Sequence, residues 1–367
     1  MKKFQLILLL LFLQAGSKAQ TNYAKASYSV DTFVQRNMAA LKIPGIALAV
    51  VENGKIIKLS TYGTANLEWD TRVTAHTNFQ IASCTKLLTS TLLLKALHQQ
   101  KISLDDPVGK FIDSIPEGWK DLKIKHLVSH SSGLKDFKGD NYLSTATIVK
   151  AIKDSALEYL PGKGQHYAQI DFMLMGHILE KIYGKPFHII LREEITQPLK
   201  MTDGAYDMEQ RTGSFMHTDL IRQRATTYYD LGGKMKGYKF MYPYYYYTAG
   251  GYYASISDLA NWAAGLDNGS LFPKAFSDGL IYARDSVNNK ISSYTKVGWI
   301  LEEENGVRYA GHSGGPGLAD ILRFPGQGYT FIVLANDGEL LPSLARSIAN
   351  FYIKKLPRKP ELEKFDR

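Results

Sequence analysis

The 367-residue chain contains a single cysteine, Cys84, so it has no internal disulfide. It also contains no repeat of fixed period and no low-complexity linker. Hydrophobic residues make up 45% of the chain and charged residues 22%, which is ordinary globular composition. The length suffices for one large domain or two ordinary ones, and stability must come from a buried core rather than from covalent links.

Long apolar runs are missing after the first 19 residues. Two lysines precede an apolar run from Phe4 to Leu13, and Ser17-Lys18-Ala19 follows with small residues where a signal peptidase cleaves. The run is shorter than the roughly 20 apolar residues that a membrane span needs. We therefore expect a signal peptide over 1–19, a mature chain from Gln20 without stable membrane insertion, and an exported protein, periplasmic or secreted.

Concentrated charge of one sign is also missing. The formal net charge is +9, but Lys and Arg alternate with Asp and Glu, without a basic stripe or a nucleic-acid motif. This pattern favours a solvated basic surface and excludes nucleic acid as the expected partner. No pattern in the sequence indicates an oligomeric state.

Strand patterns lie at both ends of the chain. From Gly45, "GIALAVVENGKIIKLSTYG" has two β-rich runs around Asn53-Gly54, a strong signal for a two-residue hairpin. "VGWILEEENGVRYAG" repeats this pattern around Asn305-Gly306, and "ADILRFPGQGYTFIVLAND" adds two strands around Pro325 to Gly328. Both ends are therefore expected to contribute to one antiparallel sheet.

Helical patterns dominate between these ends. Helices are expected at Lys86 to Gln100, at Phe172 to Gly184, from an N-cap at Ser257, and near the C-terminus from about Leu341 to Lys355. The resulting fold class is α+β: an antiparallel sheet from both chain ends, flanked by helices, with an inserted and mainly helical domain. The boundaries are sheet parts at 20–83 and 291–357, a helical part at 84–290 and a polar tail at 358–367, with a cleft at the junction.

The stretch "GHSGG", Gly311 to Gly315, matches the G-x-S-x-G nucleophile elbow of α/β-hydrolases, which would make Ser313 a nucleophile. In that fold the base histidine follows the serine. All nine histidines of this chain lie at or before position 312. The residues after Ser313 also predict a turn and a strand instead of the helix that the elbow needs. We therefore reject Ser313 as the nucleophile.

Another serine pattern, S-x-x-K, occurs three times. At the start of a helix it places a lysine one turn after a serine on the same face, where the amine can take the hydroxyl proton. Two matches have unsuitable surroundings: Ser132/Lys135, where Gly133 follows, and Ser293/Lys296, which leads into a β-rich run. Ser83/Lys86 lies at the start of the strongest predicted helix. From this pattern alone, Ser83 is either a nucleophile or only a helix cap.

Five stretches of the sequence, in chain order, resemble motifs of one known family. They are "FQIASCTKLLTSTLLLKALHQQKISLDDPVGKFI", "LVSHSSGLKDF", "QHYAQIDFMLMGHILEKIYGKPF", "TAGGYYASISDLANW" and "GHSGG". The chain closely resembles the serine β-lactamase and penicillin-binding family, especially class C β-lactamases, D-alanyl-D-alanine carboxypeptidases and related esterases. The resemblance covers nearly the whole mature chain and implies a β-lactamase/transpeptidase-like hydrolase domain over 20–357.

The resemblance also implies roles for individual residues. Ser83 would be the acylated nucleophile and Lys86 its proton partner. Tyr167 would be the second acid/base and would protonate the leaving group. His312 would orient Tyr167 or the substrate. Whether Lys86 or Tyr167 is the main base stays open.

The third motif of the family falls on the stretch that first suggested an elbow. Ser313 would lie on an edge strand beside the substrate, and Gly314 would allow a close approach. The backbone N–H groups of Ser83 and Gly315 would form the oxyanion hole, where loss of one donor typically costs about 2.7 to 4 kcal/mol.

One position departs from the family pattern. The family has Asn two residues after the catalytic tyrosine, and this chain has Gln169, which keeps the amide and adds one methylene. Gln169 either binds substrate with a shifted geometry or indicates that lactams and peptides are not the substrates. With His312 where β-lactamases have lysine, efficient β-lactamase action is less expected than peptidase, amidase or esterase action.

The expected function is that of an exported serine hydrolase, which forms an acyl-enzyme at Ser83 and cleaves an amide or ester of a small-molecule or peptide substrate without metal or cofactor. A D-alanyl carboxypeptidase or peptidase-like amidase is the leading subclass. An esterase of the same fold is the enzymatic alternative. The alternative from another class is a penicillin- or wall-peptide-binding protein without turnover, which the change at Gln169 keeps open.

The remaining conspicuous residues have structural interpretations. His126 and His130 are four residues apart, like zinc ligands on a helix, but no Glu base or third ligand accompanies them, so we expect packing. Cys84 is expected to be a small buried residue and His166 to be structural. The run Tyr242 to Tyr247 suits either a cleft wall or packing between the two parts.

Overall fold

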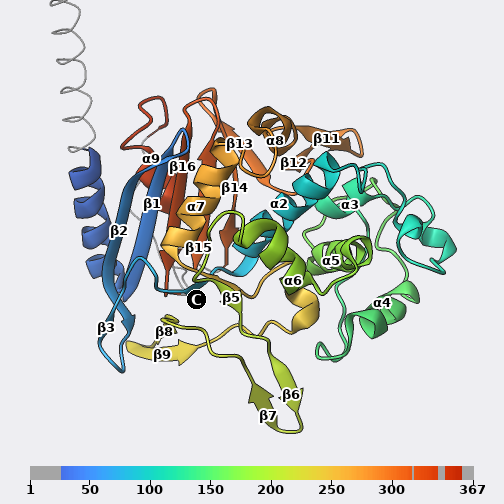
Figure 1. The fold of residues 1–367 in the computed structure, drawn as a ribbon, viewed down its shortest axis with the longest axis horizontal. Helices are drawn as coiled ribbons and strands as arrows, with labels where there is room; N and C mark the ends of the chain where they lie inside the picture. The colour runs from blue at the N-terminus through green and yellow to red at the C-terminus, as the bar shows by residue number, and fades with distance from the viewer. Residues whose placement is uncertain (1–25, 316–317, 338–343, 358–367) are drawn as a thin grey trace, which may run out of the picture.

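A computed structural model describes residues 26–315, 318–337 and 344–357 of the chain. The expected signal peptide, 1–19, and the polar tail, 358–367, lie outside the described residues. The fold class is α+β, as the sequence predicted: an antiparallel sheet built from both ends of the chain is covered by helices (Figure 1).

The main sheet has nine strands in the order β11-β12-β13-β14-β15-β16-β1-β2-β3. Its strands are β1 (Gly45–Glu52), β2 (Lys55–Asn66), β3 (Thr71–Arg72), β11 (Arg284–Val287), β12 (Lys290–Thr295), β13 (Ile300–Glu304), β14 (Val307–Gly314), β15 (Ala319–Phe324) and β16 (Tyr329–Ala335). Both Asn-Gly hairpins form, between β1 and β2 and between β13 and β14. Asn53 and Gly54 have φ values of 47° and 76°, which the tight turn requires.

Strand β1 joins the two ends of the chain, because it pairs with β2 on one side and with β16 on the other. Its side chains alternate between two cores. Ile46, Leu48 and Val50 belong to the core under the helix of residues 26–41 and α9 (Leu344–Ala349). The small residues Ala47 and Ala49 belong to the opposite core, where α7 (Ile256–Asp267) packs against the sheet (Figure 1).

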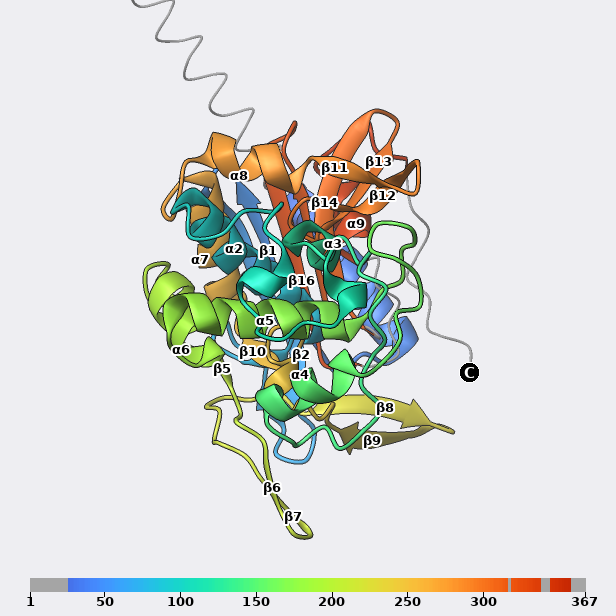
Figure 2. The same ribbon diagram turned by 90° about the vertical axis from the view of Figure 1, so that its right-hand side faces the viewer.

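The part between the two halves of the sheet carries most of the helices. They are α2 (Thr85–His98), α3 (Ile124–Val128), α4 (Thr145–Lys153), α5 (Gln169–Tyr183), α6 (Phe187–Leu191), α7 and α8 (Lys274–Ile281), with the single turns η1 (Ala82–Cys84), η2 (Val108–Lys110), η3 (Glu117–Trp119), η4 (Arg192–Thr196) and η5 (Tyr244–Tyr246). Figure 2 shows α5 lying near α4 and α3.

Short strands also occur in this part, which the sequence did not predict. They are β4 (Phe79–Gln80), β5 (Ala205–Tyr206), β6 (Gln210–Thr212), β7 (Phe215–His217), β8 (Thr227–Leu231), β9 (Lys234–Tyr238) and β10 (Tyr252–Ala254). They form one three-stranded sheet and two hairpins, of which β6–β7 projects from the molecule (Figures 1 and 2). In addition, β11 joins the main sheet at Arg284, ahead of the expected boundary at residue 291.

Two helix ends differ from the sequence-based expectation. The N-cap of α7 is Ser255, whose side chain accepts a hydrogen bond from the N–H of Asp258, and the expected cap Ser257 lies inside the first turn. Helix α9 ends at Ala349, well before Lys355, because tight turns replace the helix there. The start of that expected helix, residues 341–343, lies outside the described residues.

Candidate active site

Ser83 lies in the turn η1, directly before helix α2. Ala82 has a φ of 45°, in the left-handed region that disfavours residues with a Cβ. Ala82 and Cys84 on either side are buried, and Ser83 is half-buried. The strained turn therefore presents the Ser83 hydroxyl while its two neighbours anchor the backbone.

Lys86 lies one turn along α2 and is fully buried. Its Nζ donates hydrogen bonds to Gln169 Oε1 at 2.7 Å and to the carbonyl oxygen of Ala249 at 2.8 Å. Burial lowers the pKa of Lys86 to about 7, against the opposing effect of the Asp136 charge. A large fraction of the Lys86 side chains is therefore neutral near pH 7 and able to accept a proton.

Tyr167 makes the direct contact with the serine, since its hydroxyl donates to Ser83 Oγ at 3.0 Å. Burial raises the pKa of Tyr167 to about 12, so the phenol keeps its proton at neutral pH. Lys86 Nζ lies 4.9 Å from the centroid of the Tyr167 ring. Tyr167, from a distant segment, therefore meets the Ser83/Lys86 pair at the start of α2.

Gln169 is the first residue of α5, two positions after Tyr167. Its longer side chain reaches Lys86 through its carbonyl oxygen. The position that departs from the family pattern therefore lies inside the cluster and contacts the lysine.

His312 lies on β14 with 5% of its surface exposed, and its ring centroid is 6.0 Å from that of Tyr167. Its Nδ1–H donates to the carbonyl oxygen of Ser313 at 2.7 Å, so Nε2 carries the lone pair. Burial, followed by the charge of Lys86, lowers the pKa of His312 to about 3. His312 is therefore a neutral imidazole beside Tyr167, where the resemblance placed it.

Strand β14 lies inside the main sheet, but Ser313 lies on the end of β14 that is open on one side. Strand β14 pairs with β13 and β15, and only its residues after Gly311 extend past β13. The Ser313 hydroxyl donates to Asp320 on β15 at 3.0 Å. The edge is local to the end of β14, and in this arrangement the Ser313 hydroxyl is engaged by the neighbouring strand.

The two glycines after Ser313 have different surroundings. A Cβ on Gly314 would lie 2.2 Å from the carbonyl oxygen of Ile81, so only glycine lets β14 approach the turn ahead of Ser83 this closely. Gly315 is exposed, with open space where a Cβ would lie. The predicted oxyanion role of the Ser83 and Gly315 N–H groups stays a prediction.

The structure separates the two histidines that resembled zinc ligands. His126 Nδ1 accepts a hydrogen bond from the N–H of Lys123, at the start of α3. His130 lies beyond the end of α3 and its Nδ1 lies 2.9 Å from Asp171 Oδ2. Within the described ranges, no group of three or more His, Cys, Asp or Glu side chains is arranged to hold a metal ion.

Sequence reasoning missed His130 as a neighbour of the site. Its ring centroid lies 4.7 Å from that of Tyr167 and 4.7 Å from that of Tyr294 on β12. The motif "LVSHSSGL" was a signal, since it belongs to the family resemblance, but the spacing to His126 directed attention to metal binding instead.

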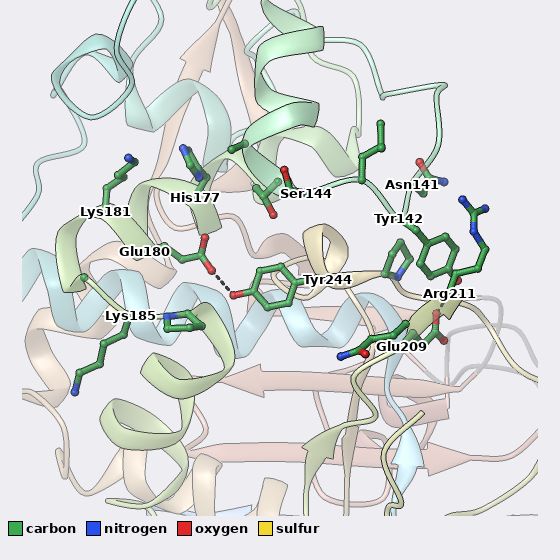
Figure 3. A pocket seen from close by; sticks show the side chains of 17 residues that line it. Asn141, Tyr142, Ser144, His177, Glu180, Lys181, Lys185, Glu209, Arg211 and Tyr244 are labelled. Atoms are coloured by element: carbon green, nitrogen blue, oxygen red, sulfur yellow. Dashed lines mark hydrogen bonds between the residues drawn. The ribbon is translucent and has the colours of Figure 1, made fainter. Parts of the chain in front are cut away.

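The run Tyr242 to Tyr247 combines packing with cavity lining. Tyr245 and Tyr247 are buried, whereas Tyr244 lines a cavity of about 730 Å³ and donates to Glu180 (Figure 3). None of Ser83, Lys86 and Tyr167 lines this cavity, which lies between α5, the start of α4 and β6. It is therefore separate from the serine cluster.

Several known proteins are similar to this chain. The family model described as Beta-lactamase matches residues 30–350. Teichoic acid D-alanine hydrolase of Staphylococcus aureus is 25% identical over 240 residues, which are 64% of this chain and 57% of that protein. The chain spans about half the length of the curated relatives it matches.

Solved structures share the fold. The penicillin-binding protein homologue from Pyrococcus abyssi has a TM-score of 0.72 and 25% identity, covering 91% of this chain and 78% of that one. D-amino acid amidase from Ochrobactrum anthropi SV3 has a TM-score of 0.68 and 20% identity, covering 84% and 92%. No helix in the part that the structure describes has the length and apolar character of a membrane span.

Proposed function

Because the chain belongs to the Beta-lactamase family, we propose that it is a serine hydrolase that forms an acyl-enzyme at Ser83. The observation that carries this proposal is the hydrogen bond from the Tyr167 hydroxyl to Ser83 Oγ, 3.0 Å long, beside the buried amine of Lys86. A serine that only capped α2 would not need an acid/base pair at its hydroxyl. The roles of Ser83, Lys86, Tyr167 and His312 are part of the proposal.

Lys86 is the proposed base for the first step. A neutral amine has two N–H groups, and the two acceptors at Lys86, Gln169 Oε1 and the Ala249 carbonyl, match them. The lone pair is then free to take the proton of Ser83 as its Oγ bonds to the substrate carbonyl carbon. Tyr167, which keeps its proton at neutral pH, is a poor base and a suitable donor.

The second half of acylation breaks the bond to the leaving group. Tyr167 gives its proton to the departing nitrogen or oxygen, and the proton held by Lys86 restores the phenol. Water then attacks the acyl-enzyme, with the same groups returning the proton to Ser83. Backbone N–H groups of Ser83 and Gly315 are the proposed donors to the oxyanion, and the neutral ring of His312 supports Tyr167.

The proposed substrate is an amide of a D-amino acid, with D-alanyl carboxypeptidase or peptidase-like amidase action as the leading subclass. The names of the similar proteins support this class, since one is a teichoic acid D-alanine hydrolase and another a D-amino acid amidase. The second candidate is an esterase. It is favoured by Gln169, whose carbonyl oxygen already accepts a hydrogen bond from Lys86 and so has only one lone pair left for the N–H of an amide substrate.

Export is also part of the proposal. The apolar run from Phe4 to Leu13 supports a cleaved signal. N-terminal sequencing of the protein recovered from the periplasm or the medium is expected to begin at Gln20. Retention of Met1 in an exclusively cytoplasmic protein would contradict this.

Labelling with a fluorescent penicillin tests the nucleophile, with turnover of a p-nitrophenyl ester and of a D-Ala-D-Ala peptide measured alongside. Wild type should label and Ser83→Ala should not. Ser293→Ala is the matched control, because Ser293 belongs to another S-x-x-K match and is exposed. Label or turnover that persists in Ser83→Ala refutes the proposal. Peptide turnover indicates the peptidase, ester turnover alone the esterase, and stable labelling without turnover a binding protein.

A further inference from the structure

We propose that His130 is a positioning residue that holds the Tyr167 hydroxyl against Ser83. The inference rests on the proposed roles of Ser83 and Tyr167. His130 has no contact with Ser83 among the hydrogen bonds of the described residues, so it acts through Tyr167. The evidence lies in the backbone beside Tyr167, in the ring contacts and in the support behind His130.

His130 holds the chain on both sides of Tyr167. Its carbonyl oxygen accepts the N–H of His166 at 2.9 Å. Its ring Nδ1 accepts the N–H of Ala168 in a longer hydrogen bond of 3.4 Å. The residues before and after Tyr167 are therefore both tied to one residue, which limits rotation of the backbone that carries the phenol.

The ring of His130 also supports the phenol directly. It packs against the Tyr167 ring with centroids 4.7 Å apart. It also contacts Tyr294, edge to face with centroids 4.7 Å apart, and Tyr294 in turn stacks on Tyr167 at 6.3 Å. Each of the three aromatic rings thus contacts the other two. The direction of the Tyr167 hydroxyl therefore depends on the position of the His130 ring.

Buried polar groups hold that ring in turn. His130 is fully buried, and the buried Asp171 on α5 lies 2.9 Å from its Nδ1. Burial raises the pKa of Asp171 and lowers that of His130 to about 3, so the His130 ring is neutral at pH 7. Asp171 shares a hydrogen bond with Nδ1 through one carboxyl oxygen, and its other oxygen accepts a hydrogen bond from the Ser132 hydroxyl.

The backbone of His130 shows that its place is imposed by the surroundings. Its φ is 53°, in the left-handed region that is uncommon for residues other than glycine, although histidine is found there more often than most residues. A backbone held in this region is less stable than in the ordinary regions unless specific contacts compensate. The hydrogen bonds and ring contacts of His130 compensate for this conformation.

The test is His130→Asn. Asparagine tolerates the left-handed backbone and keeps a short amide near Asp171, but it removes the ring beside Tyr167. His126→Asn is the matched control, because the Nδ1 of His126 also accepts a backbone N–H, from Lys123, and His126 lies just ahead of the same motif. Circular dichroism and the melting temperature check that each variant folds.

Comparing two esters with different leaving groups distinguishes a misplaced Tyr167 hydroxyl from a general disruption of the site. An alkyl ester needs a proton on its departing oxygen, whereas p-nitrophenolate leaves without one. In His130→Asn, kcat should fall about 100-fold for the alkyl ester and about tenfold for the p-nitrophenyl ester, since a 1 Å misplacement can cost about 100-fold. KM should change less than about threefold, and His126→Asn should match wild type.

Ser132→Ala is the milder second variant, because it removes only the hydroxyl behind Asp171. It should show the same leaving-group preference, and it decides the outcome if His130→Asn does not fold. Equal losses for both esters, a change in KM alone, or wild-type kcat in a folded variant would overturn the inference. If Ser83→Ala keeps activity, the proposed function fails as well. If Ser83→Ala is inactive while His130→Asn equals wild type, only the positioning role fails.

Discussion

Acylation should follow the ionisation of Lys86. Burial lowers the pKa of Lys86 from an ordinary value of 10.5 to about 7. At pH 7 about half of the molecules then hold a neutral amine, compared with about one in 3,000 for an unperturbed lysine. The neutral fraction rises from about one tenth at pH 6 to about nine tenths at pH 8, so the second-order rate constant for acylation should rise about tenfold over that range.

The direction of this effect follows from the buried position. Desolvation disfavours the charged amine, and neither a hydrogen bond to Gln169 nor the Ala249 carbonyl removes that penalty. Lys86→Arg provides the perturbation, since guanidinium stays charged throughout this range and cannot act as a base. Loss of a general base typically costs about 100- to 10,000-fold, so acylation in Lys86→Arg should be slower by that factor.

The assay is stopped-time labelling with the fluorescent penicillin at several pH values between 5.5 and 8.5, with the label quantified on gels. Ser293→Ala, from the exposed S-x-x-K match, should follow the wild-type profile. Acylation that does not depend on pH in this window refutes the role of Lys86 as base. Acylation in a folded Lys86→Arg within tenfold of wild type leads to the same conclusion.

Three further predictions concern stability. The buried Lys86 releases its proton at about pH 7, while the unfolded chain keeps it until near pH 10.5, so the free energy of unfolding should rise by about 2 kcal/mol from pH 7 to pH 9. Urea unfolding of Lys86→Met should lack that rise, and an equal rise in both proteins would contradict the assignment. Gly314→Ala places a Cβ 2.2 Å from a backbone carbonyl oxygen and should cost about 1 to 3 kcal/mol, whereas Gly315→Ala, with open space around it, should unfold like wild type. Arg323 is 2% exposed and pairs with carboxylates of α7 and α8 at 2.5 and 2.6 Å, so Arg323→Ala should cost about 3 to 5 kcal/mol in the same assay; a cost below 1 kcal/mol would show that water reaches the pair.

Local signals explain which parts of the fold were predictable. The Asn53-Gly54 and Asn305-Gly306 turns form because each pair of residues accepts the positive φ values that a tight hairpin needs. Helix α2 and the α+β class follow from the hydrophobic pattern in the same way. That β14 lies inside the sheet and only its end, with Ser313, is open on one side could not be predicted, because strand order depends on which distant segments pair with β14.

The N-cap of α7 shows that even a local feature of the fold can depend on a neighbouring element. Ser255 and Ser257 are both acceptable N-caps by residue type, and the sequence pattern favoured the second. The chain ahead of the helix lies in β10, which ends at Ala254, so the helix begins at the first residue able to turn. The choice between two equivalent residues therefore came from the neighbouring strand.

The candidate site also has features that the sequence determines and features that depend on tertiary structure. The sequence by itself determined that Lys86 follows Ser83 by about one turn at the start of a helix, because that spacing depends only on their separation of three positions along the chain. Only the tertiary structure decided that Tyr167, 84 positions away, bonds to Ser83, and that His130 packs behind it. The low pKa of Lys86 also depends on that packing, because desolvation comes from segments that are distant in sequence and no local pattern encodes it.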